Sequence, residues 1–430
     1  MQAEGGGAIT YFRSLSAAGF AATAIGYGPA RMGFGLFVPD FRTAFSMSTS
    51  TIGLVSSLGF FGFFLGLLAA QLLLTRRGPE APVLLGLCAA TLGMVIIAAA
   101  LNVAVLAVGV FLAASSAGFA WTPFNDAVHR KVRDADRPTA LSDISTGTSI
   151  GIVVAGGTAL AMVLMGFSWR YCWAAFAMAG ALVLVGNWLA LRPVERGPAG
   201  TKGQWRGVLQ ASALPLFGIG FVLGTTSAIY ISFAADRVRE IGGVPGLPAA
   251  AAPALIFISY GLFGLAGLLT SRAKEALGLV WLLRLLMGAG TLSLVIVAMM
   301  PDRWAGVVLS AGLQGVHVMM TSAVLAFWSE RLFPALPSLS FAAVLLVMAA
   351  GSVLGPGLAG LASGAAGPMA MFLGAAVLPA AAVLFLRGHH ASERPLLAEL
   401  EAVRRERAGR TPDRKSIRMR HTWHGDGEGA

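Results

Sequence analysis

The chain has 430 residues, of which 56% are hydrophobic and only 12% are charged, and its formal net charge is +11. A soluble domain carries about a quarter charged residues, so this composition excludes an ordinary soluble protein and indicates an integral membrane protein. The positive charge does not indicate a nucleic-acid partner, because the basic residues fall in short loops and a tail between apolar runs. Cys88 and Cys172 both lie inside apolar runs and indicate neither a disulfide framework nor a metal site.

Apolar runs long enough to cross a bilayer, about 20 residues each, follow one another along the chain. Six lie near 15–38, 51–74, 81–101, 103–125, 141–165 and 171–191, and six more near 210–234, 252–271, 277–300, 304–328, 337–362 and 368–386. The sequence therefore predicts an all-α membrane protein with twelve transmembrane helices. We expect an N-terminal six-helix bundle (1–192), a cytoplasmic linker (193–206), a C-terminal six-helix bundle (207–387) and a basic tail (388–430) that is disordered or surface-amphipathic.

Lysine and arginine accumulate on one side of these runs, including the segment 192–206 and the C-terminal tail. The positive-inside rule places that side in the cytoplasm. The other side carries fewer charges, among them Asp40, Arg42 and the mixed segment 236–240. An even number of crossings then puts both termini in the cytoplasm, and we expect a multi-pass protein of the cytoplasmic (inner) membrane.

The two halves of the chain repeat a glycine pattern at an offset of about 200 residues, as transporters built from repeats do. Residues 147–157 read GTSIGIVVAGG and residues 351–360 read GSVLGPGLAG, each in the fifth run of its half. Glycines spaced by four also allow close helix packing, so a packing role and a gating role both stay open. The residues concerned are Gly147, Gly151, Gly351, Gly355 and Pro356.

The chain resembles the major facilitator superfamily over nearly its whole length before the tail. The loop after the second run contains TRRG, which is similar to a loop motif of that family: Arg76 and Gly78 are kept, and Thr75 stands for an aspartate. Gly355 and Pro356 match the glycine-proline motif of the family's fifth helix. The resemblance implies two six-helix bundles around a central cavity that opens alternately to either side, no ATP site, and a gating role for Arg76 and Gly78.

A narrower resemblance is to the YbfB/YjiJ-type branch of this superfamily. It rests on the stretches GYGPARMGFGLFVP (26–39), GFAWTPFNDAV (118–128), GTSIG (147–151) and GPGLAG (355–360). This branch implies no particular substrate.

Arg31 lies inside the first apolar run, where a central arginine costs roughly 2.5–3.5 kcal/mol by insertion scales. Such a residue usually faces a protein interior or a water-filled cavity. Tyr27 lies one turn before it on the same face, and Pro29 between them removes a backbone donor and should loosen the helix. We interpret Arg31 as an anchor whose planar guanidinium holds a carboxylate; the alternative is an arginine that pairs with backbone carbonyls or extends to the membrane surface.

Polar side chains at helical spacing occur on the first, fourth, seventh and tenth runs, which line the cavity in the family that the chain resembles. They are Tyr27 and Arg31, Trp121 and Asn125, Thr226, Tyr230 and Phe233, and Gln314, His317 and Thr321. We predict that substrate binds to Arg31, Tyr27, Trp121, Asn125, Thr226, Tyr230, Gln314 and His317.

Titratable groups are scarce inside the runs. His317 is the only histidine within one, so it is the candidate for proton coupling, with a neutral hydrogen-bonded histidine as the equal alternative. No aspartate or glutamate lies in the middle of a run, which favours an anionic over a cationic substrate. Asp126 and Arg130, one turn apart, are expected to form a solvated pair at a helix end or part of a gate.

The sequence thus predicts a secondary transporter that moves a small organic anion by alternating access, with protons as a candidate coupling ion. It indicates no enzyme, because neither a phosphate-binding GxxxxGK[ST] loop nor HExxH occurs and no serine lies in a GxSxG turn. It indicates no cofactor, metal or nucleic acid either. Two alternatives stay open: an exporter of amphipathic compounds in which Arg31 is structural, and a non-transporting membrane sensor or scaffold acting through the basic tail.

Overall fold

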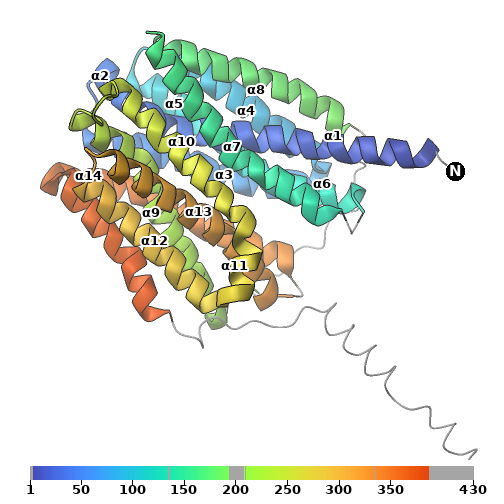
Figure 1. The fold of residues 1–430 in the computed structure, drawn as a ribbon. Helices are drawn as coiled ribbons and strands as arrows, with labels where there is room; N and C mark the ends of the chain where they lie inside the picture. The colour runs from blue at the N-terminus through green and yellow to red at the C-terminus, as the bar shows by residue number, and fades with distance from the viewer. Residues whose placement is uncertain (1–2, 134–135, 193–207, 209, 335, 387–430) are drawn as a thin grey trace, which may run out of the picture.

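A computed structural model describes the chain at residues 3–133, 136–192, 208, 210–334 and 336–386 (Figure 1). The described residues form helices and the short connections between them. The predicted linker 193–206 and the basic tail 388–430 lie outside the described residues, and so do the sequence interpretations that concern them.

The N-terminal part of the chain, before the linker, begins with one long helix in which a π-helical turn separates two α-helical segments. Its elements are α1 (Ala3–Ile25), the π-helix η1 (Gly26–Met32), α2 (Gly33–Phe45), α3 (Thr49–Arg77), α4 (Glu80–Ala98), α5 (Val103–Gly118), α6 (Trp121–Lys131), α7 (Arg137–Leu164) and α8 (Trp169–Leu191).

The C-terminal part, after the linker, is built in the same way, with short 3-10 turns at three places. Its elements are η3 (Ala211–Ala213), α9 (Leu214–Glu240), η4 (Ala249–Ala251), α10 (Ala252–Gly264), η5 (Leu265–Leu269), α11 (Thr270–Leu277), α12 (Leu279–Met299), α13 (Trp304–Leu332) and α14 (Pro337–Phe385).

Ten helical segments of the described residues are long and apolar enough to cross a membrane. This number is two lower than the twelve predicted runs, and the difference arises at two places in the chain. The run 15–38 is not among the ten, because the helix passes there through the π-helical turn η1. The runs 337–362 and 368–386 both fall in α14, which Gly367 interrupts with a φ of 85°. The all-helical membrane architecture agrees with the sequence, and the count of twelve stays a prediction.

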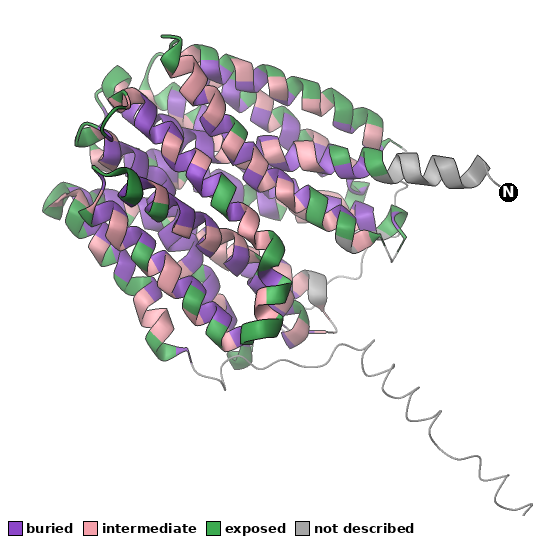
Figure 2. Cartoon of the chain, in the orientation of Figure 1, coloured by how far each residue is buried: buried purple, intermediate pink, exposed green. Residues whose placement is uncertain are grey.

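Helices α1–α8 pack mainly among themselves, and α9–α14 do the same (Figure 1). The most extensive contacts between the two parts are those of α2 with α9, α3 with α14, and α7 with α10. Buried positions are concentrated where helices face each other, and exposed positions lie on the outside (Figure 2). Many of the exposed residues are large and apolar. Leu54, Leu182 and Leu384 are 62%, 74% and 76% exposed, a pattern that fits a surface covered by lipid rather than by water.

The repeated glycines of the sequence occupy equivalent packing positions in the two parts. A Cβ atom at Gly151 would overlap the backbone of Ala24 in α1, and one at Gly355 would meet the backbone of Thr225 in α9. Gly147 and Gly351 lie one turn earlier, on the carbonyl groups of Phe20 and Phe221 respectively. In each part, therefore, the helix with the glycine repeat packs on the part's first long helix at backbone distance.

The loops after α3 and α11 also correspond to each other. Gly78 and Gly278 both have a φ of 76°, a left-handed conformation that glycine adopts without steric cost. In each case the glycine N–H donates to a carbonyl four residues earlier, from Leu74 and Lys274. Helices α3 and α11 thus end in the same type of glycine turn. Arg76 is exposed in the last turn of α3.

The packing role of Gly151 predicts opposite effects for two otherwise identical substitutions. Gly151→Ala should lower the thermal stability of the purified protein, because the new methyl group meets backbone that cannot move aside. Gly157→Ala, six residues along α7, has nothing within 4 Å of the added methyl group and should raise stability, since alanine is favoured over glycine in a helix by about 0.5–1 kcal/mol. Thermal unfolding in one detergent measures both; equal effects of the two changes would contradict the packing role.

Candidate functional site

Arg31 lies in the π-helical turn η1, where the first long helix is locally widened. Pro29 lies inside this turn and has no N–H, so the regular α-helical hydrogen-bond ladder is broken there, as the sequence predicts. π-helical turns inside α-helices are rare and occur frequently at functional sites. The turn reads GYGPARM and presents Tyr27 and Arg31 from the same short segment.

Aromatic rings surround the Arg31 guanidinium. Its Cζ atom lies 4.1 Å from the ring centre of Phe63, 5.5 Å from that of Phe60 and 5.4 Å from that of Tyr27. Phe60 and Phe63 belong to α3 and are themselves buried. A guanidinium against ring faces gains cation–π attraction, about 0.5–2 kcal/mol for a contact of this kind.

Arg31 has no anionic partner within the part of the chain that the structure describes. None of the ion pairs there includes it, and its Nε is buried without a hydrogen-bond partner. The rest of the side chain is half-buried, so the guanidinium is held by ring faces but remains partly accessible. The sequence alternative, an arginine that pairs with backbone carbonyls, has no such hydrogen bond in the described residues to support it.

The C-terminal part faces Arg31 with Tyr260 of α10. The two side chains are close enough to interact electrostatically, and Tyr260 is only 2% exposed. Its hydroxyl is buried without a hydrogen-bond partner. On the neighbouring helix α13, Gln314 is fully buried, and neither its amide oxygen nor its amide nitrogen has a partner among the described residues. Sequence reasoning selected Gln314 but missed Tyr260, whose apolar surroundings resemble any core helix.

Thr226 and Tyr230, two further predicted site residues, are hydrogen-bonded within the C-terminal part. The Thr226 hydroxyl donates to the carbonyl of Val222 one turn earlier, at 2.8 Å. The Tyr230 hydroxyl is hydrogen-bonded to Ser310 Oγ of α13, at 3.0 Å. Both side chains are buried, and the Tyr230 bond joins α9 to α13 whereas the Thr226 bond stays within α9.

His317, the candidate for proton coupling, faces α12. Its Nδ1 lies 2.8 Å from the carbonyl oxygen of Leu286, and its ring lies against Gly290. Because a carbonyl accepts only, Nδ1 carries the proton and donates, which leaves the Nε2 lone pair unpaired in the buried interior. The structure therefore places His317 between α12 and α13.

Trp121 and Asn125 of α6 are half-buried. Trp121 packs against the main apolar core, and the Asn125 side-chain oxygen is buried without a partner among the described residues. One turn on, Arg130 donates two hydrogen bonds to Asp126, one of them at 3.1 Å, and both residues are more than a quarter exposed. This pair lies within one helix, as expected for a solvated helix end.

Two ion pairs connect α2 to α9, and sequence reasoning did not identify them. Arg42 donates two hydrogen bonds to the Asp236 carboxylate, with Nε to Oδ1 at 2.9 Å, and Arg239 donates to Asp40 Oδ1 at 2.9 Å. Each helix thus contributes one acid and one base, so the pairs cross between the parts. The available signal was the occurrence of both charge signs at the ends of the first and seventh runs, Asp40 with Arg42 and Asp236 with Arg239.

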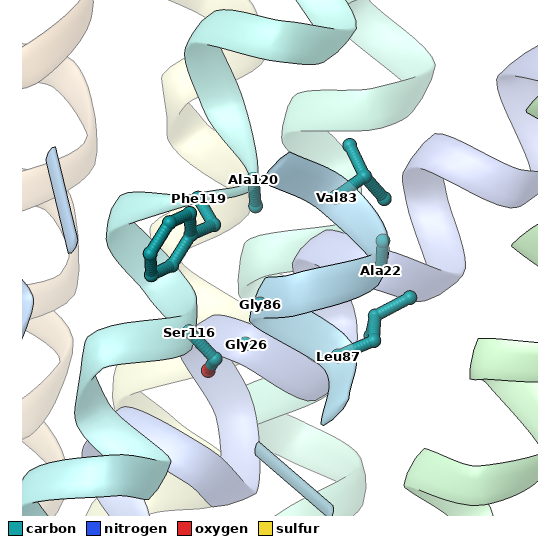
Figure 3. A pocket seen from close by; sticks show the side chains of 8 residues that line it. All are labelled: Ala22, Gly26, Val83, Gly86, Leu87, Ser116, Phe119 and Ala120. Carbon is teal, nitrogen blue, oxygen red and sulfur yellow. The ribbon is translucent and has the colours of Figure 1, made fainter. Parts of the chain in front are cut away.

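The small cavity in Figure 3 is not a substrate site. It has a volume of about 10 Å³ and lies within the N-terminal part, between α1, η1, α4 and α5. Its lining is apolar apart from Ser116, whose hydroxyl already donates to the carbonyl of Ala113. A buried water needs about this much space and two or more polar partners, so the cavity is a gap beside the π-helical turn.

A comparison with family models decides the affiliation of this fold. The model of the Major Facilitator Superfamily matches residues 19–332. The chain belongs to the major facilitator superfamily. Proteins of this superfamily are multi-pass membrane transporters that bind small molecules, so the expectations of a membrane transporter, and of a protein that is not an enzyme, are confirmed. A comparison with curated proteins gives no match.

Solved structures of transporters share the fold of this superfamily member. A mutant of the nucleoside transporter NupG has a TM-score of 0.69 at 15% identity, over 87% of this chain and 98% of that chain. A bacterial homologue of the human lysosomal transporter Spinster, inward-facing and occupied, has a TM-score of 0.68 at 16% identity, over 89% of this chain and 98% of that chain. A POT family transporter in complex with 5-aminolevulinic acid has a TM-score of 0.69 at 13% identity, over 87% and 94%.

The crossed pairs predict a strong energetic coupling between Arg42 and Asp236. Their bidentate geometry and the 7% exposure of the Asp236 side chain favour a contribution of about 1.5–3 kcal/mol. A double-mutant cycle of Arg42→Ala and Asp236→Ala, read by thermal unfolding of the purified protein, measures it.

The Asp126–Arg130 pair is the matched control for this cycle. It is solvent-exposed and spans one helical turn, so its own cycle should show only about 0.3–0.5 kcal/mol. A coupling for Arg42 with Asp236 no larger than this control value would contradict a role for the crossed pairs in joining the two parts.

Proposed function

We propose that the protein is a secondary active transporter that moves a small organic anion with a carboxylate-like group across the cytoplasmic membrane by alternating access. The observation that carries the proposal is the Arg31 guanidinium, which lies among aromatic rings with no anionic partner in the described residues. Arg31 anchors the anion, and Tyr27 closes the same side of the site.

The energetics of Arg31 support an anionic substrate. A buried arginine costs several kcal/mol, and the ring contacts offset only part of this. A carboxylate binding in the guanidinium plane would add two charge-assisted hydrogen bonds while Phe63 keeps one ring face against it. A cation would have no corresponding acid at this place. The POT family transporter with 5-aminolevulinic acid shows that the fold itself can accommodate a small carboxylic acid.

The two parts move as two six-helix bundles with twelve transmembrane helices in total and with both termini in the cytoplasm. In this arrangement the α2–α9 end is the outer end, and the Arg42–Asp236 and Arg239–Asp40 pairs hold it closed. Opening to the outside requires both pairs to separate, while the backbone contacts of Gly151 with α1 and of Gly355 with α9 persist within each bundle. Transport then consists of a rocking of one bundle against the other around Arg31.

Substitution of Arg31 tests the anchor. Purified protein in liposomes should catalyse counterflow of at least one small monocarboxylate, and Arg31→Ala should reduce it by about 10- to 150-fold, which corresponds to 1.5–3 kcal/mol of charge-assisted hydrogen bonding. Arg31→Lys should keep a weak remnant, because an ammonium group retains the charge but not the planar pair of donors.

Arg284→Ala is the matched control for the Arg31 variants. The Arg284 guanidinium donates two hydrogen bonds to the carbonyl of Leu386, near the end of α14 and away from the aromatic rings that surround Arg31. This variant should retain counterflow. Undiminished counterflow in Arg31→Ala would refute the anchor.

Protons are the proposed coupling ion, with His317 as the acceptor. Its unpaired Nε2 can take up a proton, while Nδ1 stays bound to the Leu286 carbonyl. His317→Gln should therefore flatten the pH dependence of uptake driven by a proton gradient, while counterflow at equal pH on both sides persists. An unchanged pH profile in this variant would exclude His317 as the coupling site.

A further inference from the structure

Buried polar atoms without partners occur on several helices of both parts, and two of the side chains concerned lie on the neighbouring helices α10 and α13. The Tyr260 hydroxyl and both polar atoms of the Gln314 amide are enclosed and unpaired within the described residues. Groups of this kind are costly to leave without hydrogen bonds, so they normally have a partner. In the same part Tyr230 pairs with Ser310 and Thr226 with Val222, whereas Thr225, Thr321 and the Nε2 of His317 are also without a partner.

Close helix packing fixes the backbone positions of Tyr260 on α10 and of Gln314 on α13. Gly315, next to Gln314, lies on the backbone carbonyl of Tyr260, so α10 and α13 meet at backbone distance there. On its other side α10 meets the N-terminal part, because Gly261 lies against Ser149 and Val153 of α7. Tyr260 is therefore held at the junction of the two parts, within electrostatic range of Arg31.

We propose that Tyr260 and Gln314 form the second half of the Arg31 site and select a monocarboxylate that carries an uncharged hydrogen-bonding group, such as an amide. In this arrangement the carboxylate lies between the Arg31 guanidinium and the Tyr260 hydroxyl. The Gln314 amide, which offers one donor group and one acceptor, pairs with the amide of the substrate. The inference rests on the proposed function and adds the substrate class to it.

The charges around the site exclude two neighbouring classes of substrate. The residues in contact with the guanidinium are Tyr27, Phe60 and Phe63, with Tyr260 within electrostatic range, and none of them is a second cation for a dicarboxylate. They supply no carboxylate either, so the ammonium group of a free amino acid would remain unpaired. The uncharged amide of an N-acylated amino acid avoids both penalties.

Four small probes distinguish these classes in a thermal-shift titration of the full-length purified protein. They are N-acetylglycine, which has one carboxylate and an amide, pentanoate, which has the carboxylate alone, succinate, which has two carboxylates, and glycine, which has an ammonium group. N-acetylglycine should stabilise the protein at about tenfold lower concentration than pentanoate, because it alone satisfies Gln314, and succinate and glycine should bind more weakly than both.

Two variants assign the effect to the named side chains. Tyr260→Phe should raise the concentration needed for N-acetylglycine and for pentanoate about tenfold, and Gln314→Leu should remove the preference between these two probes. Both variants should melt at or above the temperature of the unliganded parent protein, since each removes an unpaired buried polar group. A purely structural role would lower the melting temperature instead. Tyr171→Phe, on the exposed face of α8, is the control and should change neither property.

The outcomes separate this inference from the proposed function. Arg31-dependent binding of pentanoate with an unchanged preference in Gln314→Leu and unchanged titrations in Tyr260→Phe would overturn the role of these two residues and leave the Arg31 anchor standing. A preference for succinate or glycine, or no stabilisation by any of the four probes, would overturn the substrate class. Binding and counterflow that survive Arg31→Ala would overturn the proposed function itself.

Discussion

The structure depends on one charged group that has no counter-charge among the described residues. The Arg31 guanidinium is kept inside apolar helices by the faces of Phe63, Phe60 and Tyr27, and these contacts stabilise the cation without neutralising it. A carboxylate from a neighbouring helix would have given more stability but would also have occupied the guanidinium permanently. The π-helical turn is part of this arrangement, because it places Tyr27 and Arg31 on a segment whose backbone hydrogen bonds are interrupted by Pro29.

The helices within each part are packed rigidly, in contrast to the Arg31 guanidinium, whose charge is only partly compensated. Glycines bring α7 onto α1 and α14 onto α9 at backbone distance, so these contacts resist shear between helices. The contacts between the parts are of two kinds. The α2–α9 pairs are charged and partly exposed, whereas α3 and α14 meet where Ser57 Oγ accepts a hydrogen bond from Gly357 N at 2.9 Å. Charged pairs can exchange protein partners for water more readily than buried helix seams can separate, so the α2–α9 end is the place where relative motion costs least.

Much of this arrangement could be predicted from local patterns in the sequence, and the rest could not. Apolar runs locate the helices, Pro29 marks the interrupted turn, and a lone arginine in an apolar run marks the centre of the site. The glycine pattern of 147–151 and 351–355 locates equivalent packing surfaces. Tyr260 was missed because ALIFISYGLFG is indistinguishable from a core helix, and its importance arises from a neighbour more than 200 residues away in the chain. The same holds for the pair of Asp40 and Arg239. His317 was selected by its spacing from Gln314, but the contact of its ring with α12 could not be predicted from that spacing.

Alternating access adds a constraint on energies, because a transporter must visit both of its states with free energies that differ by only a few kcal/mol. The two crossed pairs favour the closed α2–α9 end, so the opposite state needs compensating contacts at the other end of the molecule, where α6 and α11 lie (Figure 1). Asp126 and Arg130 carry opposite charges at that end, and their pair within α6 contributes little to stability. Binding of an anion at Arg31 does not by itself favour either end. In the proposed mechanism the bound anion supplies the counter-charge that Arg31 lacks among the described residues, and so it lowers the cost of passing through the state in which both ends are closed.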